Sequence, residues 1–294
     1  MVKPVLKWAG GKRQLLEEII KLFPNGYEKK RLHEPMVGGG AVTFEIEPNK
    51  GTINDVNGRL TRFYEVIRDK PEELIEENRS HRYNEDYYYS ARKEFNKPIR
   101  NEDLDKVREA SLLLYLNRTC FNGLYRENSK GEFNVPFGDY NNPDYVKAEQ
   151  IRNCSQVLKN LKIENNDFEY ILDEAKKGDL VYFDPPYQPV SETANFTEYS
   201  KEGFELKDQK RLFNTCIKLD KKETYFILSN SWAKPIRKLY EKQKNFEVIK
   251  VKANRDINSK AKNRKPVSEI LATNIPKDLR IGKKQKALKK FLKD

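Results

Sequence analysis

Residues 178–189 read GDLVYFDPPYQP. The apolar run at 180–183 predicts a buried strand, which stops abruptly at Asp184 and two prolines. Proline fixes φ and has no N–H, so this segment presents acceptors, namely the Asp184 carboxylate and the Pro185 carbonyl. Tyr187 adds an aromatic face directly behind them. A strand that ends in this way indicates a binding or reactive site at its carboxyl end.

The flanking sequence predicts a sheet around this strand. Strand-like runs occupy 51–56, 179–183, 224–230, 246–253 and 268–274. Helical periodicity occupies 13–23, 57–69 and 101–119. Short strands that alternate with helices predict an α/β fold with a mostly parallel sheet. The last two strands have no helix between them, so we expect them to form an antiparallel edge pair.

Composition narrows the class of protein. The 294 residues are 37% hydrophobic and 35% charged, enough for one large α/β domain or for a core domain with an insertion. No run approaches 18 apolar residues and the N-terminus lacks a signal peptide, so we expect a cytoplasmic protein without a membrane span. Three scattered cysteines and two histidines argue against a disulfide framework, a metal site and a Ser-His-Asp triad.

The formal net charge of +12 favours a polyanionic partner such as nucleic acid, although a solvated lysine-rich surface explains it equally well. Two basic stretches lie near the end of the chain. The first, 252–265, is the predicted loop of the terminal hairpin and a candidate for phosphate contacts. The second, 277–294, is a tail that we interpret as a solvated charge run.

The middle of the chain has a different pattern. Long charged helices are followed by a turn-rich segment, and no stretch reads as a parallel strand. We therefore predict a core domain formed by 1–57 and 147–276, an inserted, mainly helical module at 58–146, and a basic tail at 277–294. Within the module, the turn signals N-G and K-G predict that GEFNVPFG, 131–138, forms half of a β-hairpin.

A second motif, HEPMVGGGAV at 33–42, places glycines after a short apolar strand that we expect to end near Met36–Val37. Asp55 ends the next predicted strand, where an acidic residue in nucleotide-binding α/β folds reaches the ribose hydroxyls. The alternative is a glycine-rich turn with a helix-capping aspartate. KWAGGK, 7–12, lacks P-loop spacing, so a nucleoside ligand without a triphosphate fits better, with Trp8 as a stacking face and Lys12 as a cation.

The DPPY segment suits a planar base that carries an exocyclic amine. Two acceptors that take both hydrogens of adenine N6 favour a more tetrahedral nitrogen and free its lone pair to attack a methyl sulfonium. In duplex nucleic acid the base must first leave the stack, and Tyr187 replaces part of the lost stacking. The alternative interpretation is a proline-rich turn with an aspartate cap.

Several motifs occur together in one order: KWAGGK, HEPMVGGGAV, INDVN, NRTCFNGLYREN, GEFNVPFG, DPPY and TANFTEY. Over roughly residues 5–275 they resemble the Dam family of DNA adenine N6-methyltransferases, and within it the α-group of the D12 class. The resemblance implies a Rossmann-like class I methyltransferase sheet with an inserted recognition domain. It also implies transfer of a methyl group from S-adenosylmethionine to adenine N6 in double-stranded DNA, most often in GATC.

The resemblance assigns roles residue by residue. The catalytic positions are Asp184, Pro185, Pro186 and Tyr187. The cofactor positions are Trp8, Lys12, Glu34, Met36, Gly38, Gly40, Asp55, Asp167, Phe168 and Asp184. Glu34 and the glycines match the loop around the methionine part, and Asp167 with Phe168 matches the pair that holds the adenine of the cofactor. Met36 departs from the family pattern, which usually has Phe before V-G-x-G; methionine can fill the same space.

Recognition of DNA is assigned to the turn-rich segment and to one N-terminal lysine. The positions are Lys7, Arg118, Phe121, Asn122, Leu124, Arg126 and Pro136. A guanidinium reads a guanine edge well, which suits Arg126, and Leu124 and Pro136 suit a thymine methyl. Phe121 is a candidate wedge for the gap that a flipped base leaves. The alternative is a hairpin with an aromatic core and no contact to bases.

Three other functions remain open from the sequence: methylation of RNA adenine, methylation of protein glutamine, and DNA binding without catalysis. Glutamine enzymes usually begin this loop with Asn, whereas this chain has Asp184. An intact DPPY with Asp55 argues against a non-catalytic protein. For the DNA enzyme we expect a monomer or a weak dimer on DNA.

Overall fold

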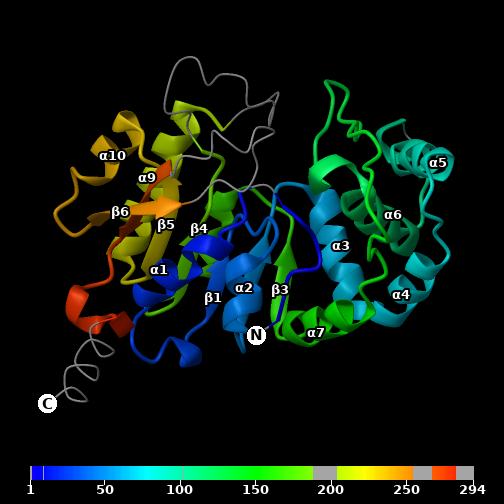
Figure 1. The fold of residues 1–294 in the computed structure, drawn as a ribbon. Coiled ribbons are helices and arrows are strands. Elements are labelled where there is room, and N and C mark those ends of the chain that lie inside the picture. Colours follow the sequence, from blue (N-terminus) through cyan, green and yellow to red (C-terminus); the bar gives the residue numbers. More distant parts are fainter. Residues whose placement is uncertain (1, 9, 101, 188–203, 254–266, 283–294) are drawn as a thin grey trace, which may run out of the picture. The chain divides into compact units, whose positions relative to one another are not determined.

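The computed structural model describes residues 2–8, 10–100, 102–187, 204–253 and 267–282 (Figure 1). The chain divides into two compact units, Met1–Gly11 with Val37–Asn166 and Lys12–Met36 with Asp167–Asp294. Each unit has its own hydrophobic core. Seven strands belong to one mixed sheet with helices around it, which confirms the α/β class. Among the described residues, none of the helices is both long enough and apolar enough to cross a membrane.

In the first unit, β2 (Gly51–Asn54) pairs in parallel with β3 (Leu161–Glu164). The helices are α2 (Ala41–Ile46), α3 (Gly58–Asp69), α4 (Pro71–Arg79), α5 (Glu85–Phe95), α6 (Lys106–Thr119) and α7 (Ala148–Leu158). Short 3-10 turns lie at Lys97–Arg100 and Phe121–Gly123. The strand β3 was not predicted.

Helix α6 is the centre of the helical part of this unit and packs against α3, α4 and α5 (Figure 1). We predicted a helix from residue 101, but it begins at Lys106. The reason is that the Asp105 side chain caps it, accepting hydrogen bonds from the backbone N–H groups of Val107 (2.9 Å) and Arg108 (3.0 Å). Nearly all of its residues are buried, as expected for a helix that is apolar on several faces.

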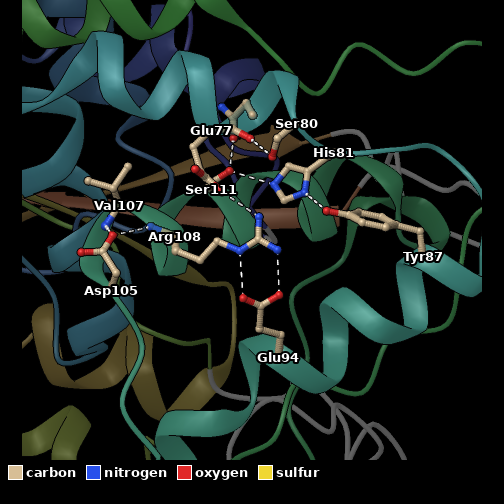
Figure 2. Close-up of polar contacts among 10 residues, drawn as sticks. Glu77, Ser80, His81, Tyr87, Glu94, Asp105, Val107, Arg108 and Ser111 are labelled. Carbon is tan, nitrogen blue, oxygen red and sulfur yellow. Dashed lines mark hydrogen bonds and ion pairs between the residues drawn. The ribbon is translucent and has the colours of Figure 1, made fainter.

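A buried polar network joins α4, α5 and α6, as Figure 2 shows. The Ser111 hydroxyl donates to Asn78 Oδ1 at 2.7 Å, so it accepts from His81 Nε2 at 2.8 Å. That tautomer leaves His81 Nδ1 to accept from the Tyr87 hydroxyl at 2.8 Å. Burial, followed by the nearby positive charge of Arg108, lowers the pKa of His81 to about 4. His81 is therefore a neutral connector at physiological pH.

Arg108 stabilises the same helices through charge. Its guanidinium donates two hydrogen bonds to the Glu94 carboxylate, at 2.9 and 2.7 Å, and a third to Glu77 at 2.7 Å. The two-pronged geometry to Glu94 is the arrangement in which a guanidinium pairs most strongly with a carboxylate. One side chain of α6 thus holds α5 and α4 in place (Figure 2).

In the second unit, strands β1 (Leu32–Glu34), β4 (Leu180–Phe183) and β5 (Tyr225–Ser231) are parallel. β7 (Val267–Thr273) pairs antiparallel with both β5 and β6 (Glu247–Ala253). The helices are α1 (Leu16–Lys21), α8 (Ile171–Glu174), α9 (Leu206–Lys221) and α10 (Lys234–Tyr240), with 3-10 turns at Arg13–Leu15, Tyr27–Lys29, Phe168–Tyr170 and Lys277–Leu279. The antiparallel terminal pair is confirmed, with β6 at the edge and β7 inside.

Of two further local predictions, one is wrong and one is confirmed. The strand before the glycines ends at Glu34 instead of Met36–Val37, since Pro35 follows and has no N–H for the sheet. The predicted hairpin is present in a short form, because the antiparallel bridge between Glu127 and Phe133 is flanked by backbone hydrogen bonds from Asn128 N–H to Glu132 O at 2.8 Å and from Asn134 N–H to Arg126 O at 3.1 Å. A side chain also holds it: Asn96 accepts from Phe133 N–H at 2.9 Å and donates to Phe133 O at 3.0 Å.

Some predictions fall outside the described residues. They are the TANFTEY motif at 193–199, most of the basic hairpin loop at 252–265, and most of the tail at 277–294. The division into a core at 1–57 and 147–276 with a module at 58–146 stays a prediction, since the two compact units follow packing and not function.

Candidate functional site

The predicted site residues occur in both units, and each group has a defined environment inside its own unit. Asp184 directly follows β4 in the second unit, at the carboxyl end of the parallel strands. Its Oδ1 accepts from the Lys12 ammonium at 2.8 Å and from the Ser229 hydroxyl at 2.9 Å. Ser229 in turn accepts from the Tyr182 hydroxyl at 2.9 Å. Within the described chain, both donors therefore reach the same carboxylate oxygen.

The pKa of Asp184 differs from that of an aspartate on the surface. Burial raises the pKa of Asp184, while the Lys12 ammonium and the Ser229 hydroxyl act in the opposite direction. Lys12 is 6% exposed and Asp184 22%. The result is a buried carboxyl group of increased basicity, held in place by two donors.

The rest of the DPPY loop is fixed by buried side chains from other elements. The Pro186 carbonyl accepts from Gln209 Nε2 at 3.1 Å, and Gln209 Oε1 accepts from Asn230 Nδ2 at 2.9 Å. Gln209 lies on α9 and Asn230 on β5, and both are fully buried. The clamp therefore acts on the Pro186 carbonyl, and the role of Asp184 and Pro185 as a pair of acceptors stays a prediction.

Tyr187 is held at both its hydroxyl and its ring. The hydroxyl donates to Glu269 Oε2 at 2.6 Å, and the Lys12 ammonium lies over the ring at 4.5 Å from its centroid. Burial raises the pKa of Tyr187, and the negative charges of Asp184 and Glu269 raise it further. The phenol therefore stays protonated and remains a donor.

The other cofactor candidates of the second unit have varied surroundings. Glu34 is buried in β1, and Met36 packs against the hydrophobic core. Asp167 is exposed and caps the 3-10 turn by accepting from the N–H of residue 169 at 3.0 Å. Phe168 is 5% exposed, and the Arg211 guanidinium lies 5.0 Å from its ring centroid while also pairing with Asp167 at 2.9 Å.

In the first unit, Asp55 organises the glycine loop. Its carboxylate accepts from Gly38 N–H at 3.1 Å and from Asn57 N–H at 2.9 Å. The Gly38 carbonyl accepts from the Tyr64 hydroxyl at 2.6 Å. Burial raises the pKa of Asp55, and the two backbone donors partly offset that change. Asp55 therefore lies directly against the glycine loop, while its predicted contact with ribose hydroxyls stays a prediction.

Trp8 packs directly on the glycine loop. A Cβ atom at Gly38 or at Gly39 would lie 2.9 Å from the Trp8 side chain, so only glycine fits beneath it. Gly40 has a φ of +69° and a similarly close neighbour in Phe44. The Trp8 indole also stacks on Tyr125, with centroids 5.0 Å apart and planes 25° apart. The sequence did not predict this last contact.

Lys7 and the turn-rich segment are clamped together by Asn117, a fully buried residue of α6. Asn117 Oδ1 accepts from Lys7 N–H at 2.8 Å, and its Nδ2 donates to the carbonyls of Lys7 at 2.8 Å and Gly123 at 3.3 Å. Gly123 has a φ of +64°, and a Cβ there would meet the Lys7 side chain at 2.3 Å. Burial, then the charge of Arg118, lowers the pKa of Lys7.

The predicted base-reading residues follow on this clamped backbone. Phe121 is 51% exposed, Asn122 is exposed with a φ of 58°, and Phe121 N–H donates to the carbonyl of exposed Pro136 at 2.9 Å. Arg126 is half-buried and its Nε donates to Asn134 Oδ1 at 2.8 Å. Arg118 and Leu124 are also half-buried.

Sequence reasoning missed the residues that hold these groups: Asn117, Tyr125, Gln209, Ser229, Asn230 and Glu269. One signal was available, because Asn117 interrupts the apolar run LLLYL and a polar residue there needs a buried partner. Three further polar residues, 229–231, end the apolar strand β5 in the same way. In the part of the chain that the structure describes, no group of three or more His, Cys, Asp or Glu side chains could hold a metal ion.

Comparison with known proteins identifies the family of the chain. The family model "D12 class N6 adenine-specific DNA methyltransferase" matches residues 8–257. The type II methyltransferase M1.LlaDCHI of Lactococcus lactis is 43% identical over 276 residues, 93% of this chain and 95% of that protein. The type II methyltransferase M.MjaIII of Methanocaldococcus jannaschii is 42% identical over 291 residues, 93% of this chain and 99% of that one.

The DNA adenine methylase of Escherichia coli K12 is also similar, with 36% identity over 275 residues, 92% of this chain and 95% of that protein. The family model covers most of the chain, and these relatives match nearly their whole length. This chain belongs to the D12 class of N6 adenine-specific DNA methyltransferases.

Proposed function

We propose that this enzyme transfers a methyl group from S-adenosylmethionine to N6 of an adenine turned out of double-stranded DNA, within the sequence GATC. The observation that carries the proposal is the DPPY loop. Its Asp184 carboxylate is held through one oxygen by Lys12 and Ser229, beside the ring of Tyr187.

The family resemblance assigns binding of the cofactor to ten residues, which include Trp8, Lys12 and Asp55. Each oxygen of the Asp55 carboxylate takes one backbone N–H, and a carboxylate oxygen has a second lone pair. Asp55 can therefore still accept hydrogen bonds from two ribose hydroxyls. Glycines whose Cβ atoms would collide with Trp8 leave backbone, and no side chain, along that loop. When bound, S-adenosylmethionine supplies an electrophilic methyl group on a sulfonium, which the N6 lone pair takes while the C–S electron pair stays on sulfur.

The protein activates the amine by position and charge. The Asp184 carboxylate and the Pro185 carbonyl accept the two N6 hydrogens, which frees the nitrogen lone pair. Because burial raises the pKa of Asp184, its carboxylate is also a suitable first acceptor of the proton that N6 loses. Tyr187 replaces part of the stacking that the base gives up on leaving the helix.

Sequence reading is assigned to Lys7 and to the segment from Arg118 to Pro136. The Asn117 clamp fixes this backbone, and Phe121, Asn122 and Pro136 are exposed on it. These positions match the GATC-reading element of the resembled family, and Arg126 is suited to a guanine edge. We propose that the protein acts as a monomer or a weak dimer on DNA.

The test is a protection assay. Purified protein is incubated with S-adenosylmethionine and unmethylated plasmid, which is then cut with nucleases that respond to adenine methylation in GATC. Protection establishes duplex DNA, adenine and GATC together. Methyl transfer to plasmid without protection at GATC would refute the sequence assignment alone. Tritium transfer from labelled cofactor to RNA or to protein glutamine, and not to DNA, would refute the substrate, and binding without any transfer would refute catalysis.

A further inference from the structure

The hydrogen bond between Tyr187 and Glu269 is short and direct. The phenol donates to Glu269 Oε2 at 2.6 Å, within the 2.5–2.7 Å range typical of a hydroxyl bound to a carboxylate. Such charge-assisted bonds are roughly twice as strong as neutral ones. The contact joins residues that are 82 positions apart in the sequence, and no motif in the chain predicts it.

Glu269 offers a rigid point of attachment. It lies in β7, where it is paired with Ser231 of β5 on one side and with Val251 of β6 on the other. A strand that is hydrogen-bonded on both sides holds its side chains in fixed directions. Tyr187, in contrast, stands in the irregular segment after β4. The orientation of its ring is therefore set by a side chain of the sheet.

The ring and the Asp184 carboxylate face a common group. The Lys12 ammonium is 2.8 Å from Asp184 Oδ1 and 4.5 Å from the centroid of the Tyr187 ring. An amine that occupies the position of the Lys12 ammonium therefore contacts both the Asp184 carboxylate and the face of the Tyr187 ring. For an aromatic base, the tilt of the Tyr187 ring then decides whether an amine on the stacked base also reaches Asp184.

We propose that Glu269 is a positioning residue for methyl transfer: it fixes the plane of the Tyr187 ring against which the target adenine stacks, and so aligns N6 with Asp184. The inference rests on the proposed function, because it takes adenine as the stacked group. Glu269 touches neither the base nor the cofactor in this role, and it acts only through Tyr187.

The experiment compares four variants with wild type: Glu269→Ala, Glu269→Gln, Tyr187→Phe and the double variant Tyr187→Phe/Glu269→Ala. Single-turnover methylation is measured on a GATC duplex, together with the affinity for DNA. The matched control is Glu241→Ala, which removes an exposed acid that pairs on the surface with Arg237 at 3.1 Å. A second duplex carries 2-aminopurine at the target adenine, whose fluorescence reports the stacking of the flipped base.

Misplacement of a reacting group by about 1 Å costs about 100-fold in rate. We therefore expect Glu269→Ala and Tyr187→Phe each to lower the single-turnover rate by about 10- to 100-fold, with changes in DNA affinity below about threefold. Each single substitution removes the same hydrogen bond, the one between Tyr187 and Glu269. The double variant should therefore be no slower than the slower of the two single variants. Glu269→Gln should recover most of the rate, because its amide oxygen still accepts from the phenol. Altered 2-aminopurine fluorescence should accompany the slow variants.

Three results would overturn the inference while wild type is active: Glu269→Ala at the wild-type rate, multiplied losses in the double variant, or Glu269→Gln as slow as Glu269→Ala. If Glu269→Ala fails to fold, Glu269→Gln and Tyr187→Phe still decide the question. If wild-type protein transfers no methyl group to DNA adenine, the proposed function itself fails, and the inference fails with it.

Discussion

The DPPY loop and the segment from Cys120 to Phe137 differ in how exposed their predicted functional side chains are and in what holds them. In the loop, functional groups themselves are held: the Asp184 carboxylate by Lys12 and Ser229, and the Tyr187 hydroxyl by Glu269. In the second segment, which we propose reads DNA, Asn96 and Asn117 hold the backbone, and Phe121, Asn122 and Pro136 are exposed on it. A group that reacts needs a fixed position, whereas a surface that reads DNA needs a fixed backbone and side chains that can reach the bases.

The largest effect should come from the loop. Asp184→Ala removes the acceptor for the amine, and loss of a single preorganised electrostatic partner typically costs a factor of about 100 to 1,000 in kcat. Because Asp184 also receives the proton, we expect a loss of about 1,000-fold or more in single-turnover methylation. The variant should still bind DNA, and filter binding measures this. Asp173→Ala, at an exposed acid on α8 of the same unit, is the control and should keep full activity.

An Asp184→Ala enzyme that kept even a tenth of its rate would place the acceptor elsewhere. The DPPY loop would then no longer be an example of a reacting group that is held in a fixed position.

The second prediction concerns the helices that support the recognition segment. In the folded protein His81 stays neutral down to about pH 4, whereas an unfolded histidine takes up its proton near pH 6.5. Between these values the unfolded state binds more protons, so the free energy of unfolding falls as the pH drops from 6.5 to 4. The loss is about 3 kcal/mol, at about 1.4 kcal/mol per pH unit. Urea unfolding of wild type and His81→Gln at pH 7 and pH 4.5 measures it.

His81→Gln should be less sensitive to acid than wild type by most of that amount, since glutamine does not titrate. Equal pH dependence in the two proteins would mean that the network in Figure 2 does not depend on a neutral imidazole.

The third prediction tests the reading surface. Arg126→Ala should reduce the preference for GATC over a duplex with one substituted guanine by about 10- to 100-fold, because a bidentate contact contributes about 1–3 kcal/mol of discrimination. Affinity for S-adenosylmethionine should not change. Competition between the two duplexes in single-turnover assays gives the ratio. Lys130→Ala, at an exposed cation of the same segment, serves as the control and should leave the ratio unchanged.

The two regions also differ in how far the sequence predicts them. An apolar run followed by DPPY identified both β4 and the residues that follow it, since strand and loop are continuous in the chain. The turn residues of the segment from Cys120 to Phe137 are local, and they predicted its short hairpin. The sequence did not predict the support from Asn96, 37 residues before Phe133, because that pairing depends on the packing of α5.

The same limit applies to the residues that hold Asp184 and Tyr187. Ser229 reaches Asp184 because β4 and β5 are in parallel register, with Phe183 opposite Leu228. Register follows from the packing of both faces of a sheet, and a sequence pattern does not define it. The contact of Glu269 likewise depends on β7 lying between β5 and β6, and the predicted edge pair did not specify which of its two strands lies inside.

The smallest expected effect concerns the two groups that donate hydrogen bonds to Asp184, which are Lys12 and Ser229. Ser229→Ala removes one hydrogen bond to the carboxylate and leaves the Lys12 ammonium in place. A single hydrogen bond contributes about 1 kcal/mol net, so the single-turnover rate at pH 8 should fall by about fivefold. The Ser229 hydroxyl favours the ionised form of Asp184, so its removal should raise the pKa of Asp184 further.

The rate requires the carboxylate, so it declines as the pH falls through the pKa of Asp184, and in Ser229→Ala this acid limb should move to higher pH. A pH series of single-turnover rates for wild type and variant measures the displacement. Ser231→Ala, two residues further along β5, is a control from the same strand. If Ser229→Ala slowed the reaction equally at every pH, the hydroxyl would act on the position of Asp184 alone. The pH series therefore distinguishes two roles of Ser229: holding Asp184 in position, or also lowering the pKa of its carboxyl group.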